Sequence, residues 1–186
     1  MKNTKQKIAI ASVTVLLIFS VISGLVVPYL QNFGTETVDK NAVQNEEKIA
    51  IPDFEFKNLE GETVNLSDFA GKPIVMNFWG TWCPFCTLEL PEFDKAAAEY
   101  GDKVNFILLD VEEDSNMTRQ AVADYLAEKG IENLTTYYDD PGYGIYIFGV
   151  NSFPLTVYID SEGYFFNAKS GMTSYDEIVA NINAIL

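Results

Sequence analysis

Two cysteines, Cys83 and Cys86, are the residues of this 186-residue chain whose type and spacing could do chemistry. They follow an apolar, β-prone run at residues 74–79, which is broken by Gly80, and apolar residues then return at helical spacing. This pattern predicts a strand, a turn and a helix from residue 83 to 100, with both thiols on the first turn of the helix. A dithiol that can close to a disulfide is the chemistry that such a turn could carry.

The three-residue spacing decides what the two thiols can do. Side chains at positions i and i+3 of a helix are neighbours and can form a short disulfide. Pro84 suits the first helical position, where the missing N–H costs nothing. The free N–H groups and the positive dipole end there favour a thiolate, so we expect Cys83 to be the more acidic, exposed nucleophile. Cys86, one turn inward, would be the resolving thiol.

Other uses of a cysteine pair must be compared with redox chemistry. Zinc needs about four ligands, and the chain has two cysteines and no histidine, so no metal site is expected. A structural bridge between near neighbours would stabilise little, because the loop it closes is short. An inert bridge and a two-thiolate copper(I) site stay open as alternatives. Redox chemistry without a bound cofactor is the favoured interpretation.

The segment from Asn77 to Cys86, NFWGTWCPFC, is followed by Glu89-Leu90-Pro91. It resembles the active-site segment of thioredoxin-like proteins, and more closely that of the membrane-tethered extracytoplasmic thiol-disulfide oxidoreductases of the ResA/TlpA type. The resemblance extends over residues 50–186. It implies a thioredoxin-like α/β fold, with a central mixed sheet flanked by helices and an extra N-terminal β-hairpin.

The chain before this domain has a different composition. Residues 8–30 carry no charge, follow Lys2, Lys5 and Lys7, and would span roughly 35 Å as a helix, enough for a hydrocarbon core of about 30 Å. We therefore predict a transmembrane signal-anchor within residues 1–30, a flexible linker at 31–49, and a domain at 50–186 outside the cytoplasm. A cleaved signal peptide is the alternative. The net charge of −15 argues against nucleic acid as a partner.

The pattern along the domain predicts alternating strands and helices. By itself it favours an α/β domain with a mainly parallel sheet. A proline at position 91 should kink the first helix, and Ser174 with Glu177 forms a capping box before the last one. The expected hairpins are at 54–66 and 155–169, the other expected strands at 104–111 and 134–138, the second helix at 118–129, and a short helical or turn segment at 142–149.

The resemblance also assigns residues to substrate binding. Pro154 matches the proline that precedes a strand and faces the cysteines with a cis peptide bond, although residues alone favour a trans strand-start proline. Phe153 before it would offer its backbone to an extended substrate. Trp82, Pro84 and Phe85 would shape the docking surface around the thiol.

Resolution by Cys86 requires a group that takes its proton, and the chain offers no histidine. Asn77 stands where thioredoxins bury an aspartate, a departure that the membrane-tethered relatives share. Glu89, three residues after Cys86 on the same helical face, is expected to be partly buried with a raised pKa and to accept this proton. Glu113 matches a second acidic position of the family that this chain resembles. Its acidic neighbours in the sequence, Glu112 and Asp114, are alternatives. Solvated carboxylates at these positions are the competing interpretation.

The expected function is reduction of disulfides in exported or membrane-bound proteins, and the resemblance implies that the electrons come from a membrane thiol donor. An apocytochrome c or a surface methionine sulfoxide reductase is the kind of target that the resemblance implies. A disulfide-forming oxidase is the first alternative, but the Pro84-Phe85 pair has no histidine to stabilise the thiolate of a strong oxidant. A copper(I) chaperone is the second alternative, but the copper-binding relatives use a distal histidine as third ligand and this chain has no histidine.

Overall fold

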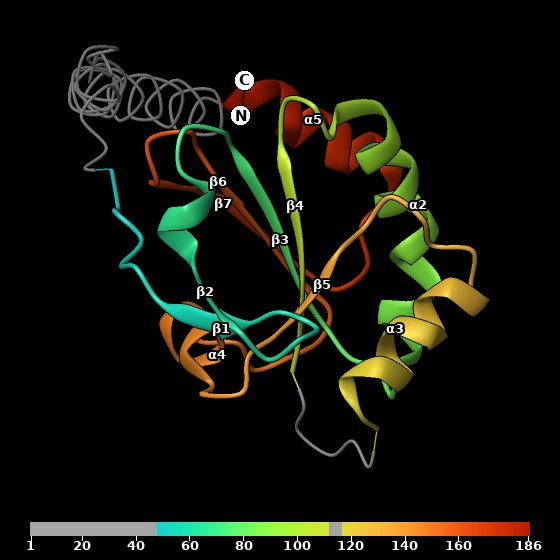
Figure 1. The fold of residues 1–186 in the computed structure, drawn as a ribbon. Coiled ribbons are helices and arrows are strands. Elements are labelled where there is room, and N and C mark those ends of the chain that lie inside the picture. The colour runs from blue at the N-terminus through green and yellow to red at the C-terminus, as the bar shows by residue number, and fades with distance from the viewer. Residues whose placement is uncertain (1–47, 112–116) are drawn as a thin grey trace, which may run out of the picture. The chain divides into compact units, whose positions relative to one another are not determined.

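Strand β3 (Ile74–Trp79) and helix α2 (Pro84–Tyr100) are the two elements predicted on either side of the cysteine turn, and the computed structural model contains both (Figure 1). The structure describes residues 48–111 and 117–186. The predicted membrane segment and the linker up to residue 47 lie outside the described residues. Among the helices described, none is long and apolar enough to cross a membrane.

The strands form one seven-stranded sheet in the order β2-β1-β5-β4-β3-β6-β7. β3 lies inside it, parallel to β4 and antiparallel to β6. The mainly parallel sheet predicted from the pattern is wrong, because only β3–β4 and β4–β5 are parallel pairs. The two predicted hairpins are present as the β1–β2 and β6–β7 pairs, and the antiparallel pairs that the pattern did not predict are β1–β5 and β3–β6. The central mixed sheet that the resemblance implies is confirmed. The remaining strands are β1 (Glu55–Lys57), β2 (Thr63–Asn65), β4 (Asn105–Asp110), β5 (Thr136–Tyr138), β6 (Leu155–Ile159) and β7 (Phe165–Ser170).

The helices begin and end close to the predicted limits. α2 continues through Pro91 to Tyr100. The capping box before the last helix is confirmed, since the Ser174 side chain accepts from the Glu177 N–H and the Glu177 carboxylate accepts from the Ser174 N–H. The other helices are the 3-10 helix η2 (Leu66–Phe69), α3 (Arg119–Glu128), α4 (Tyr143–Phe148) and α5 (Tyr175–Ile185).

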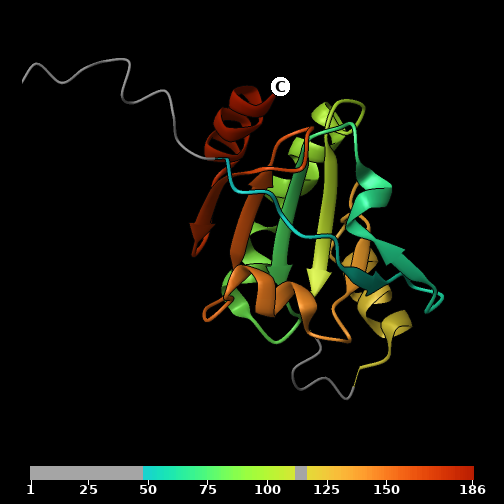
Figure 2. The same cartoon turned by 90° about the vertical axis from the view of Figure 1, so that its left-hand side faces the viewer.

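Alternate residues of β3 face opposite sides of the sheet, as the strand period requires. Ile74, Met76 and Phe78 pack into a cluster with residues of β1, η2 and α4. Val75 and Trp79 pack on the other side, against residues of α2, α3 and α5. Figure 2 shows α4 beside the arrowhead ends of β3 and β4. Asn77 alternates with Val75 and Trp79, so its side chain faces the side of the sheet that α2 covers.

Candidate active site

The two cysteines lie at the N-terminus of α2, joined by a disulfide with their Cα atoms 5.3 Å apart. Cys83 is the residue before the helix, and Pro84 is its first residue, as predicted. The Cys86 N–H donates to Cys83 Sγ over 3.2 Å, so the sulfur takes the place of a capping oxygen. The Cys83 N–H donates to the Gly80 carbonyl over 3.1 Å and closes the turn that follows β3. Cys83 Sγ is thus placed where the free amides of the helix can stabilise a negative charge.

Both cysteines are buried in the disulfide form. Cys86 is 0% exposed and Cys83 is 4% exposed, so the expectation of an exposed Cys83 is wrong for this form. Cys83 belongs to an apolar cluster with Trp79, and Phe153 packs against that cluster. Its sequence neighbours Trp82 and Phe85 are instead exposed, at 45% and 60%.

An aromatic pair stands beside the disulfide. The rings of Trp82 and Phe153 meet edge to face, with centroids 5.3 Å apart. The indole of Trp82 also lies on Gly80, where a Cβ atom would come within 2.6 Å of Trp82 Nε1. The Phe153–Pro154 peptide bond is cis, as the resemblance implies. Gly80, Trp82 and the Phe153–Pro154 loop therefore lie together at the cysteine end of the sheet.

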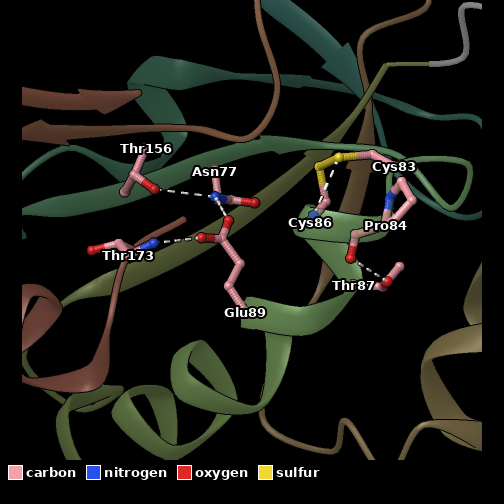
Figure 3. Close-up of a disulfide and its surroundings, with 8 residues drawn as sticks. All are labelled: Asn77, Cys83, Pro84, Cys86, Thr87, Glu89, Thr156 and Thr173. Atoms are coloured by element: carbon pink, nitrogen blue, oxygen red, sulfur yellow. Dashed lines mark hydrogen bonds between the residues drawn. A yellow bond between two sulfur atoms is a disulfide. The ribbon is translucent and has the colours of Figure 1, made fainter. Parts of the chain in front are cut away.

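Glu89 is fully buried on α2, one turn after Cys86 (Figure 3). Its Oε1 accepts from Asn77 Nδ2 over 2.9 Å, and its Oε2 accepts from the Thr173 N–H over 2.8 Å. Burial raises the pKa of Glu89 to about 7, although the hydrogen bonds from Thr173 and Asn77 lower it. The raised pKa expected for Glu89 is confirmed, and the carboxyl can take up or release a proton near neutral pH.

Asn77 of β3 connects this carboxylate to the neighbouring strand. Its Nδ2 also donates to Thr156 Oγ1 over 3.1 Å, and Thr156 is the residue opposite Asn77 in the β3–β6 pair. Asn77 is 1% exposed, and its Oδ1 has no hydrogen-bond partner in the part of the chain that the structure describes. Asn77, at the position where thioredoxins bury an aspartate, therefore donates two hydrogen bonds through Nδ2 and leaves Oδ1 without a donor among the described residues.

A family model described as the AhpC/TSA family matches residues 48–163. The chain belongs to the AhpC/TSA family. This AhpC/TSA protein is 33% identical over 138 residues to the thiol-disulfide oxidoreductase ResA of Bacillus cereus, covering 68% of this chain and 73% of that one. It is 31% identical over 128 residues to the thioredoxin-like protein YneN of Bacillus subtilis, covering 69% and 74%.

Solved structures agree with these sequence relatives. The exposed lipoprotein thioredoxin Etrx1 of Streptococcus pneumoniae matches with a TM-score of 0.63 and 28% sequence identity. The match covers 72% of this chain and 99% of the Etrx1 chain. The structure of MTB DsbF matches with a TM-score of 0.63 and 27% sequence identity. The match covers 72% of this chain and 95% of the DsbF chain. The protein thus has a thioredoxin-like fold and is a thiol-disulfide oxidoreductase of the ResA/DsbE type. Its redox group is its own cysteine pair and not a bound cofactor.

The structure brings together most of the residues that the sequence predicts for the site of this AhpC/TSA protein. Trp82 and Phe153 lie beside the disulfide, and Pro84 and Phe85 are exposed on the first turn of α2. Glu113 and its acidic neighbours lie outside the described residues.

The sequence analysis missed two residues of the site, Thr156 and Thr173. Thr156 lies opposite Asn77 through the antiparallel register of β3 with β6, which the sequence pattern did not predict. Thr173 contributes only its backbone N–H to Glu89, and no side-chain pattern marks such a donor.

Proposed function

We propose that this protein reduces disulfides of exported proteins outside the cytoplasm, anchored in the membrane by residues 8–30. The relatives support this placement: Etrx1 is described as an exposed lipoprotein, and a Mycobacterium tuberculosis structure, 25% identical with a TM-score of 0.60, as a secreted disulfide oxidoreductase. The uncharged run after three lysines supports an anchor. The observation that carries the function is the cysteine pair at the mouth of α2, with a buried carboxyl one turn behind it.

The reaction is two successive exchanges. The Cys83 thiolate attacks one sulfur of a substrate disulfide, the substrate S–S bond breaks, and the other substrate sulfur leaves as a thiolate. Cys86 then loses its proton and attacks Cys83 Sγ, which releases the second substrate sulfur. The Cys83–Cys86 disulfide forms, and the substrate has gained two electrons. A membrane thiol donor returns the disulfide to the dithiol by the same exchanges in reverse.

Glu89 is the proposed acceptor of the Cys86 proton. It lies three residues after Cys86 on the same face of α2, and its pKa of about 7 lets it exist in both forms at neutral pH. The substrate would dock on the uncharged surface of Trp82, Pro84 and Phe85 and pair with the chain before Pro154. Glu113 stays a proposed second acidic group.

A trapping experiment tests the function. Replacing Cys86 by Ala stops the reaction after the first exchange, so the substrate should stay covalently bound to Cys83 in the cells that make the protein. The Cys83→Ala/Cys86→Ala double variant is the matched control and should hold nothing. If no exported protein is trapped on the single variant, the proposed function is wrong. The names of the trapped proteins decide between an apocytochrome c and a methionine sulfoxide reductase.

The direction of the reaction is tested by the reduction potential against glutathione. A reductase should lie near the thioredoxin value of about −270 mV, and a value near about −120 mV would instead identify a disulfide-forming oxidase.

The role of Glu89 needs a measurement of the second exchange alone. A mixed disulfide of Cys83 with a small thiol is formed, and its resolution by Cys86 is followed against pH. We expect an inflection near pH 7 from Glu89 and, in Glu89→Gln, its loss together with a roughly tenfold or greater slowing at neutral pH. Glu128→Gln, at the exposed end of α3, is the control and should keep the inflection. An unchanged profile in Glu89→Gln would assign the proton to another acceptor.

A further inference from the structure

The side-chain amide of Asn77 is only partly used in the disulfide form. Both hydrogens of Nδ2 are donated, to Glu89 Oε1 over 2.9 Å and to Thr156 Oγ1 over 3.1 Å. Oδ1 is buried and, within the described residues, accepts from nothing. Buried polar atoms are nearly always paired, so an unused acceptor beside a reactive centre calls for a physical reason.

The orientation of this amide is fixed by the carboxylate of Glu89. Glu89 Oε2 already accepts from the Thr173 N–H, and Oε1 needs a second donor while the carboxylate is charged. Rotating the Asn77 amide by half a turn would place Oδ1 against Oε1 and remove that donor. Oδ1 must therefore point away from Glu89, and Figure 3 shows it turned toward the side of Cys86.

The missing donor appears when the disulfide is reduced. A disulfide sulfur carries no hydrogen, so the side chain of Cys86 has nothing to donate to Oδ1 in the form described here. Reduction breaks the S–S bond, adds two electrons and two protons, and leaves an S–H group on Cys86. A thiol is a weak but real hydrogen-bond donor.

We propose that Asn77 Oδ1 is the acceptor for the Cys86 thiol in the reduced protein. This inference rests on the proposed cycling of the cysteine pair between dithiol and disulfide. Asn77 is then a positioning residue: one amide holds the thiol that must lose its proton and the carboxylate that is proposed to take it. The reduced form gains a hydrogen bond that the disulfide form lacks, so Asn77 favours the dithiol.

The equilibrium with glutathione tests this gain. Asn77→Leu keeps the approximate size of the side chain and removes the Oδ1 acceptor together with the two Nδ2 donors. Loss of the acceptor acts on the reduced form alone and should shift the equilibrium toward the disulfide by about threefold to tenfold, the range of a single hydrogen bond. Tenfold corresponds to a reduction potential about 30 mV more negative. Thr136→Val, which alters a buried hydroxyl of β5, is the matched control and should leave the equilibrium within about twofold.

The pH dependence separates the hydrogen bond from a general effect on packing. A Cys86 thiolate cannot donate, so the difference between Asn77→Leu and the unaltered protein should vanish over the pH range in which Cys86 ionises. That range is measured separately, by thiolate absorbance in Cys83→Ser, where Cys86 is the one remaining thiol. The inference would be overturned if the two proteins differed in their redox equilibrium by the same amount above and below the pKa of Cys86, or if they did not differ at any pH.

A spectroscopic measurement needs no change at Asn77 and so does not depend on the folding of its variants. In reduced Cys83→Ser, the infrared S–H stretch comes from Cys86 alone and should lie at lower frequency than that of a thiol without a hydrogen-bond acceptor, such as one in an apolar solvent. A band at the position of the thiol without an acceptor contradicts the inference and leaves the proposed function untouched. Failure of the unaltered protein to cycle with glutathione would contradict the proposed function itself.

Discussion

Replacing Glu89 by Gln should change how the stability of the disulfide form depends on pH. Glu89 is 0% exposed and receives hydrogen bonds from Asn77 and Thr173. Burial raises its pKa from 4.5 to about 7, since the charged form is poorly solvated there. Glutamine has nearly the same shape and no charge at any of these pH values, so it resembles the protonated carboxyl.

The sign and size of the effect follow from proton linkage. Between pH 4.5 and about 7 the folded protein keeps a proton on Glu89 that the unfolded chain has lost, so the free energy of unfolding falls as pH rises. The contribution is fully present below pH 4.5 and lost above the folded pKa of about 7. Each pKa unit between the folded and unfolded states corresponds to about 1.4 kcal/mol. The pKa of Glu89 rises from 4.5 to about 7, so the free energy of unfolding should fall by about 3 kcal/mol.

Urea unfolding of both proteins between pH 4 and about 8.5 measures this loss. The unfolding free energy of the unaltered protein minus that of Glu89→Gln should fall by about 3 kcal/mol across this range, because all other titrating groups cancel in the difference. Glu128→Gln, an exposed substitution at the end of α3, should give a difference that stays within about 0.5 kcal/mol. A flat profile for Glu89→Gln would refute the argument that burial controls this carboxyl.

Three further substitutions test other parts of the site. Gly80→Ala should lower the free energy of unfolding by about 1 kcal/mol or more and shift tryptophan fluorescence, because its Cβ would come within 2.6 Å of Trp82 Nε1. Ser174→Ala removes the acceptor for the Glu177 N–H and should cost about 1 kcal/mol in urea unfolding. Phe85→Ser should lower kcat/KM for a protein disulfide by about tenfold, as expected for an apolar contact, and leave reduction of a small disulfide such as oxidised glutathione unchanged, because this side chain is 60% exposed.

The sequence was sufficient for the local arrangement of the cysteines. A strand that stops at a glycine, followed by Cys-Pro-Phe-Cys and a helical pattern, predicts the end of β3, the first residue of α2 and the place of both sulfurs. It was sufficient for the two hairpins, but not for the antiparallel pairing of β3 with β6 and of β1 with β5, whose strands are distant in sequence. A strand has the same alternation in either direction, and the connections decide which one it takes.

The environment of each site residue depended on contacts distant in sequence. Helical spacing places Glu89 on the same face as Cys86, but its complete burial and hydrogen bonding need Asn77 and Thr173, which lie 12 and 84 positions away. Cys83 is likewise buried in a cluster with residues of β3, α2, α3 and β4, against which Phe153 from the loop before β6 packs. Local patterns carry no information on such contacts, which arise only when the sheet and its helices assemble.

The bond from the Thr173 amide to Glu89 has a consequence for how the protein matures. A chain delivered N-terminus first presents both cysteines long before residue 173 emerges. Until then the glutamate lacks one of its two donors, and α5, which begins at Tyr175, does not yet cover the sheet beside it. Glu89, the proposed proton acceptor, thus gains its full set of hydrogen bonds last, and an incomplete chain carries both thiols before this carboxyl has its Thr173 donor.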